Sequence, residues 1–492
     1  MWLGKDRGNG PGEHTLTWLK ENESIKILGV YFNASTESSL IERNWEAKII
    51  EINKVMHNWS KRHCSIWGKT IVAKTFLLSK LNYILQSLSL PIDIQKSIDN
   101  LIFKFIWKKN NNKKVIEKVK RSTLCLDVES GGIAMISIET QQKVMLIKWL
   151  HRLLTKTNSS HFHIVDSFFK PVGGLKYFMS CNIKQELFIG LDKIESSYWK
   201  CAMIAWLNLD KSDLEVTMNH VIPIFNNNQI LYHKKPIFLT RWIIKGIKYT
   251  HQMFNNNMIK SFEEIKVELG SYGSLIFDYL IVKNAILNSE SASNTEATNQ
   301  SHTGLLQLNN KRIRNMITKK PNLNCIEIWK RKFHVNISFN FGIAVKATKE
   351  TKLRVLHFKI LHNIYPSNTL LYKMGIKESS QCEECHEIEF LDHMLFSCFK
   401  LQPFWQQINY KLCAILGNDL KLKPEQALFG LTKMDIDASN SKLNEANHLI
   451  LIAKLCIVKH RFKKPSNLTF IFEFEFLLRK RHFTSLISAN NS

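Results

Sequence analysis

The segment from Cys382 to Cys398 places four potential metal ligands within seventeen positions, which is the strongest local constraint on how this chain can fold. A Cys-x2-Cys turn presents two thiolates from one tight loop, and a tetrahedral Zn²⁺ ion needs two further ligands. We predict that Cys382 and Cys385 form the first pair and that His393 and Cys398 form the second. His386 competes for the third position, and the sequence leaves that choice open.

The ten cysteines are spread over 492 residues, so a chance cluster explains this segment less well than a metal site. We therefore expect one structural Zn²⁺ ion, without which the segment would lose its fold. The chain starts without an apolar secretion signal, so its thiols are expected to be reduced and the protein to be intracellular. Nuclear and cytoplasmic locations both stay open.

Charge is the second constraint. Lys and Arg number 68 against 42 Asp and Glu, which gives a formal net charge of +26, while 45% of the residues are apolar and argue against a disordered chain. Such an excess is typical of a phosphate-binding surface, and RNA and DNA are the predicted partners. A membrane surface would also attract this charge, but no uninterrupted apolar run approaches about 18 residues, so no membrane partner is expected.

Three helical patterns follow one another between Ser39 and Trp107. The first begins with the capping-box pattern Ser39-x-x-Glu42, the second carries Val72, Phe76 and Leu81 on its apolar face, and the third begins after Pro91. Short connections favour a three-helix bundle. Basic residues occupy its polar faces and the residue after its third helix, and as a group they favour phosphate contacts: Lys61, Arg62, Lys69, Lys74, Lys80, Lys104 and Lys108.

Two runs with β propensity precede this bundle. Leu16 to Glu21 and Ile25 to Phe32 are separated by Asn22-Glu23-Ser24, which predicts a hairpin that turns at these three residues. An isolated hairpin is marginally stable in water. We therefore expect this one to need a sheet supplied by sequence upstream of Met1.

Several short stretches, in this order, resemble the carboxy-terminal part of a LINE-type (non-LTR) retrotransposon reverse transcriptase. They are Ile27-Leu-Gly-Val-Tyr-Phe, Trp59-x7-Trp-Gly-Lys-Thr, Leu77-Leu-Ser-Lys-Leu-Asn-Tyr, Phe103-x-Phe-Ile-Trp and finally the Cys/His segment. The resemblance implies a primer-grip strand at Lys26 to Phe32, with Leu28 and Gly29 in it. It also implies a thumb at Ser39 to Trp107 and a zinc segment near the carboxy terminus.

Polymerisation by two metal ions needs paired carboxylates, and the sequence contains no Asp-Asp dipeptide. We therefore expect no catalytic residue, no Mg²⁺ site and no polymerase activity of the chain on its own. The favoured interpretation is an amino-terminally truncated remnant that binds RNA and DNA. Two alternatives are a polymerase part completed by an upstream reverse transcriptase portion in trans, and a domesticated adaptor that binds protein through its zinc segment.

The expected fold is mainly α. The expected domains are a palm remnant with a β-hairpin at 1–36, a thumb-like bundle at 37–115 and a helical post-thumb region at 116–287. A linker at 288–303, rich in Ser, Asn and Thr, then leads to a carboxy-terminal region at 304–492 that contains the zinc-binding segment 382–398.

Overall fold

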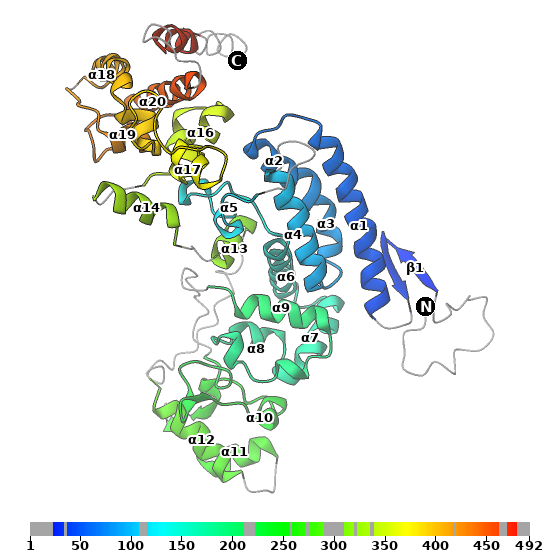
Figure 1. The fold of residues 1–492 in the computed structure, drawn as a ribbon. Coiled ribbons are helices and arrows are strands. Elements are labelled where there is room, and N and C mark those ends of the chain that lie inside the picture. Colours follow the sequence, from blue (N-terminus) through cyan, green and yellow to red (C-terminus); the bar gives the residue numbers. More distant parts are fainter. Residues whose placement is uncertain are drawn as a thin grey trace, which may run out of the picture. The chain divides into compact units, whose positions relative to one another are not determined.

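The computed structural model describes residues 23–33, 37–107, 116–210, 222–255, 258–270, 275–289, 309–318, 322–334, 339–417, 419–461 and 470–479, without the side chains of 33 and 37–42. Helices dominate this part of the chain, and its strands form only two-stranded antiparallel sheets (Figure 1). The predicted mainly α fold is confirmed.

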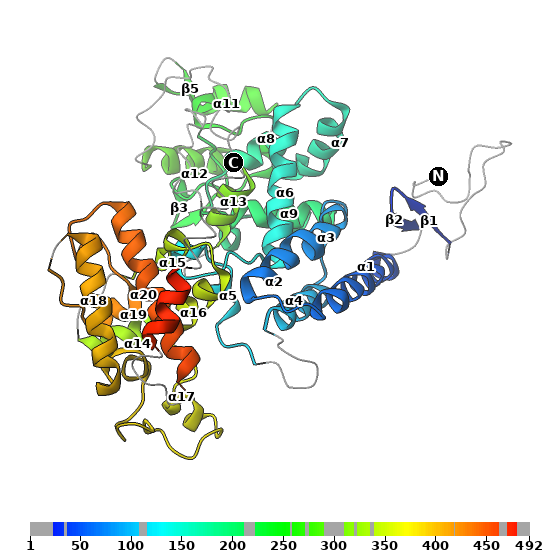
Figure 2. The ribbon, with the colours of Figure 1, turned by 90° about the horizontal axis from the view of Figure 1, so that it is seen from above.

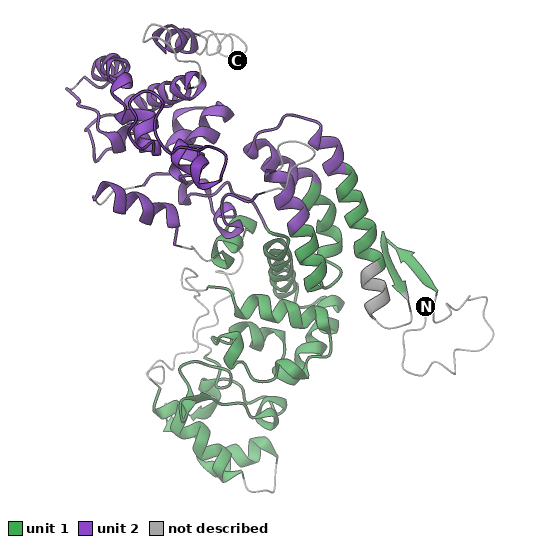
Figure 3. Cartoon of the chain, in the orientation of Figure 1, with its two compact units in different colours: residues 1–54, 77–99, 137–319 green, residues 55–76, 100–136, 320–492 purple. Residues whose placement is uncertain are grey.

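The chain divides into two compact units that alternate along the sequence (Figure 3). Unit 1 comprises residues 1–54, 77–99 and 137–319, and unit 2 comprises residues 55–76, 100–136 and 320–492. The domain limits expected from the sequence stay a prediction. Apart from residues 288 and 289, the expected linker lies outside the described residues.

The amino-terminal hairpin differs from the predicted one. Strands β1 (Ser24–Ile27) and β2 (Val30–Asn33) pair with each other, so the chain turns inside the run that was expected to be one strand. Leu28 and Gly29 both have positive φ, 49° and 87°, as a two-residue type I′ turn requires. The prediction of a turn at Asn22-Glu23-Ser24 was wrong, and Leu16 to Glu21 lies outside the described residues.

Helix α1 (Glu37–Ser60) holds this hairpin through one side chain. The Tyr31 backbone N–H donates to Asn44 Oδ1 at 2.9 Å, and Asn44 Nδ2 donates back to the Tyr31 carbonyl at 3.0 Å. Val30 is buried, whereas Leu28 at the turn is 83% exposed. Paired amide bonds to a helix thus replace part of the sheet that the sequence led us to expect.

The three predicted helical segments are confirmed, with an irregularity in the second. That segment consists of α2 (Ile66–Val72), the π-helical segment η1 (Ala73–Leu78) and α3 (Ser79–Leu85), and the third segment is α4 (Ile92–Trp107). In unit 1, Trp45 is fully buried and its Nε1 donates to the Ser89 carbonyl at 3.3 Å.

The π-helical segment moves one predicted core residue to the surface. Val72, Leu77 and Leu81 are buried, but Phe76 is 46% exposed, so its prediction as a core residue was wrong. A π turn contains one more residue than an α turn, so the buried position that would have followed Val72 passes from Phe76 to Leu77.

The rest of unit 1 packs around a core that includes Trp206 and Trp242, as predicted for these tryptophans. Its small sheets pair β3 (Leu231–Tyr232) with β4 (Lys235–Pro236) and β5 (Phe254–Asn255) with β6 (Met258–Ile259). Its further α-helices are α6 (Ile138–Thr155), α7 (Ser160–Phe169), α8 (Leu175–Ser180), α9 (Ser197–Leu207), α10 (Thr240–Ile244), α11 (Phe262–Leu269), α12 (Ile276–Leu287) and α13 (Asn310–Ile317).

Unit 2 is built around α20 (Asn440–His460), which lies beside α18 (Gln402–Leu416) in both views (Figures 1 and 2). Cys382 and Cys398 belong to the same apolar core as these helices. Its further α-helices are α5 (Arg121–Leu124), α14 (Asn324–Phe333), α15 (Ile343–Ala347), α16 (Thr351–Leu361), α17 (Asn368–Lys373) and α19 (Pro424–Phe429), and residues 470–479 are also helical.

Among the helices of the described residues, none combines the length and the apolar character needed to span a bilayer.

A buried lysine in α20 predicts how stability depends on pH. Lys454 is fully buried, its Nζ donates to the Leu428 carbonyl at 2.8 Å, and burial lowers its pKa from 10.5 to about 7. Between these two values the unfolded chain binds more protons than the folded chain, so this lysine makes stability rise with pH. We expect the free energy of unfolding to gain about 1.4 kcal/mol per pH unit from Lys454 in that window.

Urea unfolding of the wild type and of Lys454→Met at several pH values measures this contribution. The difference between the two proteins isolates Lys454, because thiols and other titrating groups are common to both. Parallel stability profiles between pH 7 and pH 10 would contradict the prediction.

Candidate metal centre and basic residues

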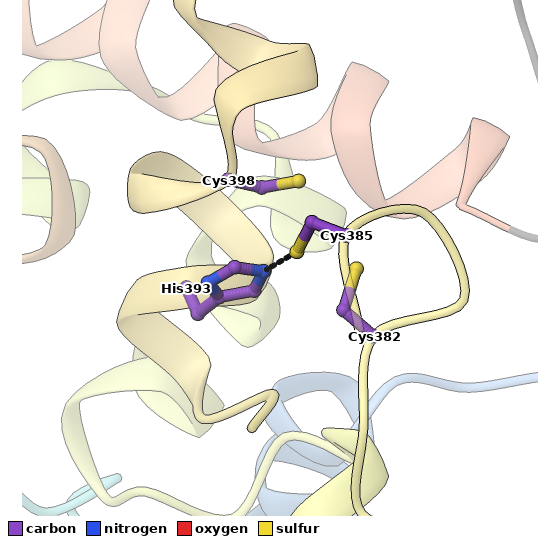
Figure 4. Close-up of side chains that lie close together, drawn as sticks. All are labelled: Cys382, Cys385, His393 and Cys398. Atoms are coloured by element: carbon purple, nitrogen blue, oxygen red, sulfur yellow. Dashed lines mark hydrogen bonds between the residues drawn. The ribbon is translucent and has the colours of Figure 1, made fainter. Parts of the chain in front are cut away.

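The four predicted ligands converge at one point of unit 2. One ligand atom from each of Cys382, Cys385, His393 and Cys398 can be chosen so that all lie within 4.8 Å of one another, and the four side chains point toward a common centre (Figure 4). Cys385 Sγ lies 3.1 Å from His393 Nε2. Ligands of a tetrahedral Zn²⁺ ion stand about 3.5–3.8 Å apart. The cluster can therefore hold a metal ion such as zinc with little movement.

A tight hairpin presents the first two thiols. Gln381 and Ile388 form an antiparallel bridge, and the Cys382 backbone N–H donates to the Glu387 carbonyl at 2.7 Å. His386 closes the turn with a φ of 61° and is exposed. Of the two histidines that the sequence left open, His393 belongs to the cluster and His386 does not.

The other two ligands come from the packed side of the segment. His393 begins the π-helical segment η9 (His393–Ser397), and Cys398 follows directly after it. Leu395 is buried between them, and its carbonyl accepts a hydrogen bond from Trp405 Nε1 at 2.9 Å. Because η9 packs into the core, His393 and Cys398 are held in place by ordinary apolar contacts.

The electrostatics of the cluster favour a cation. Burial raises the pKa of the Cys382 thiol, and burial together with the neighbouring thiols raises the pKa of Cys398 to about 12. Binding of Zn²⁺ must therefore displace protons from these groups. Glu387 Oε2 lies 3.4 Å from His393 Nδ1, and a carboxylate in that position orients the other ring nitrogen, Nε2, toward a metal.

A buried ion pair fastens the hairpin to two helices. Arg461, directly after α20, pairs with Glu389, and the two side chains are only 9% and 6% exposed. Arg461 also donates to Asn368 Oδ1 at 2.7 Å, and the Asn368 backbone N–H donates to Glu389 Oε1 at 2.8 Å. Asn368 Nδ2 reaches the Gln381 carbonyl at 2.7 Å, next to the first ligand. Burial raises the pKa of Glu389, and Arg461 opposes that shift.

Among the predicted basic contacts, Lys61, Arg62 and Lys104 are exposed, and all three belong to unit 2. The Arg62 guanidinium lies 4.4 Å from the ring centroid of Trp59. Lys108 lies outside the described residues. The exposed three are the predicted basic residues that a phosphate can reach most readily.

Three other predicted contacts have local partners. Lys80, in unit 1, pairs with Glu51 at 2.6 Å, and Lys74 donates to the Ala134 carbonyl at 3.1 Å. Lys69 is buried, with its ammonium 5.5 Å from the ring centroid of Phe105. Helical periodicity placed these lysines on a polar face but did not reveal their partners. Leu28 and Gly29, expected in the primer grip, form the turn of the β1–β2 hairpin.

Comparison with known proteins gives a weak similarity. No family model matches the chain. A protein of Arabidopsis thaliana named "Putative ribonuclease H protein At1g65750" is 25% identical over 135 residues, which is 27% of this chain and 20% of that protein. The match thus spans one fifth of the length of that relative.

The metal centre predicts a specific pattern of zinc loss. We expect one Zn²⁺ per purified wild-type chain, and loss of that zinc in Cys385→Ser and His393→Gln, because each removes one of four ligands. His386→Asn is the matched control, since it changes a neighbouring histidine to a residue that tolerates positive φ. Metal analysis by mass spectrometry decides: wild-type zinc in Cys385→Ser, or zinc loss in His386→Asn, would refute the ligand assignment.

The buried ion pair predicts a large and coupled loss of stability. Arg461→Met leaves the Glu389 carboxylate buried without its partner, and we expect a loss of about 3–5 kcal/mol in the free energy of unfolding. Adding Glu389→Gln should recover part of it. Lys411→Met is the control, because the Lys411–Glu475 pair is more exposed and should cost less than about 1 kcal/mol. Equal losses in Arg461→Met and Lys411→Met would disprove the role of the buried pair.

Proposed function

We propose that this chain is the carboxy-terminal, nucleic-acid-binding part of a non-LTR retrotransposon reverse transcriptase, with a structural Zn²⁺ ion and no polymerase activity of its own. The observation that carries the proposal is the convergence of Cys382, Cys385, His393 and Cys398. They form the last of the ordered stretches that resemble this family, and they come together from two different parts of the segment.

A structural role for zinc follows from the number of ligands. Catalytic zinc sites keep a position open for water or substrate, whereas structural sites are closed by four protein side chains. Here three thiols and one imidazole supply all four ligands, and two of the thiols belong to the core of unit 2. The metal would therefore hold the hairpin against that core.

Nucleic acid is the partner that the charge favours. A net charge of +26 attracts a polyanion, and the exposed Lys61, Arg62 and Lys104 can contact phosphates. The Arabidopsis relative carries the name of a ribonuclease, an enzyme of nucleic acid, and this similarity supports the same class of partner. Phosphate contacts carry no sequence information, so we expect little sequence preference.

A second candidate has one specific observation in its favour. Ile25, Ile27 and Leu28 of the β1–β2 hairpin are exposed, at 40%, 42% and 83%. Apolar side chains on a two-stranded hairpin suit a neighbouring sheet, so another chain that supplies the polymerase palm in trans would cover them. Primer extension in the presence of Mg²⁺ separates the two candidates, because the chain alone should extend no primer and a complemented complex would.

The salt dependence of binding tests the role of the exposed basic residues. The triple variant Lys61→Gln, Arg62→Gln, Lys104→Gln should lower the slope of log Kobs against log salt by about one for each phosphate that the variant no longer neutralises. Lys260→Gln, Lys266→Gln, Lys377→Gln is the matched control. It removes the same charge from lysines that pair with Glu268, Glu263 and Glu383.

Fluorescence anisotropy with labelled RNA and DNA oligonucleotides at several salt concentrations gives both slopes. A smaller slope in the first triple alone supports phosphate contacts at these three residues. Equal slopes in the two triples would contradict them, and binding that ignores salt would overturn the proposed function.

A further inference from the structure

Three side chains of unit 2 stack on one another at the surface, and we call them the aromatic ladder: Arg62, Trp59 and Phe76. The Arg62 backbone N–H donates to the Trp59 carbonyl at 3.1 Å, and this turn after α1 brings the guanidinium to 4.4 Å from the Trp59 ring centroid. The ring centroids of Trp59 and Phe76 are 5.3 Å apart, with an angle of 38° between the rings. Phe76, at one end of this arrangement, is 46% exposed.

The backbone is built so that Phe76 reaches the surface. In a continuous α-helix Phe76 would follow Val72 on the buried face, one turn later. The π-helical segment η1 gives the buried position to Leu77 and leaves Phe76 beside Trp59. Single π turns within helices are rare and occur frequently at functional sites. An exposed phenylalanine forgoes burial, so this geometry favours a role for the ring outside the core.

The charge around the ladder indicates what it would bind. Lys61, Arg62 and His63 are all exposed in the turn that carries Arg62 onto Trp59. Proteins that bind single strands combine such basic groups with aromatic rings on which bases stack. Base faces are free in a single strand but covered in a duplex, so the exposed ring of Phe76 fits an unpaired nucleotide.

We propose that the aromatic ladder is a stacking platform for an unpaired base of single-stranded RNA or DNA. The inference rests on the nucleic-acid binding proposed above and extends it from phosphates to bases. Phe76 would contact the base face, and Arg62 would both hold the Trp59 ring and lie near the phosphates.

Oligonucleotides with and without bases test this contact. An oligothymidylate and an abasic strand of equal length carry the same phosphates, so their difference in affinity for the full chain measures base contacts. We expect the wild type to bind the oligothymidylate about tenfold more tightly. Phe76→Leu should reduce that ratio to about twofold or less, and Phe76→Trp should restore it.

Phe472→Leu is the matched control, because Phe472 is also an exposed phenylalanine of unit 2, at 73%. It should keep the wild-type ratio, and binding of a blunt duplex should be the same in wild type and Phe76→Leu.

The outcomes separate the two proposals. Salt-dependent binding of both strands with equal affinity would overturn the stacking platform and leave the proposed function standing. A ratio unchanged in Phe76→Leu would overturn the platform as well, and would point to another partner for the ladder, such as a protein. Binding of neither strand at low salt would overturn the proposed function, and the platform with it.

Discussion

The convergence of three thiols and one imidazole inside the core of unit 2 is the constraint on which the carboxy-terminal region depends. The hairpin that carries Cys382 and Cys385 has few apolar anchors, whereas His393 and Cys398 come from a segment whose Leu395 is buried. A metal ion would join the weak half to the strong half. The thiols are protonated without a cation, so metal binding, proton release and local folding form one equilibrium.

Sequence predicted this site well because its information is local. The cysteine spacing within seventeen residues identified the ligands, and only the choice between His386 and His393 needed the structure. The Arg461–Glu389 pair had no such signal, because its partners are 72 positions apart and a charged residue at the end of an amphipathic helix is ordinarily solvated. Long-range pairs of this kind follow from tertiary packing, which periodicity does not encode.

The two errors in the amino-terminal part have related causes. Both arose where the backbone leaves its regular period: at Leu28, which adopts a left-handed conformation that leucine rarely takes, and at η1, where a π turn shifts the helical phase. The helices themselves were predicted because their apolar repeats are long, and one irregular turn changes few of them. An irregular turn does change which single side chain faces solvent, and Phe76 is such a case.

Net charge alone overstates how many cations can meet a polyanion. Lys69 and Lys454 are buried and Lys80 is paired with Glu51, so part of the +26 is engaged inside the fold. The exposed remainder supplies attraction that depends on salt and ignores sequence. Where such cations flank an exposed ring, as Arg62 flanks Trp59 and Phe76, the same surface gains a contact that salt does not screen. Phosphate attraction and base stacking therefore differ in their response to salt, and a protein that uses both keeps a residual affinity for unpaired strands after its attraction to duplexes has been screened.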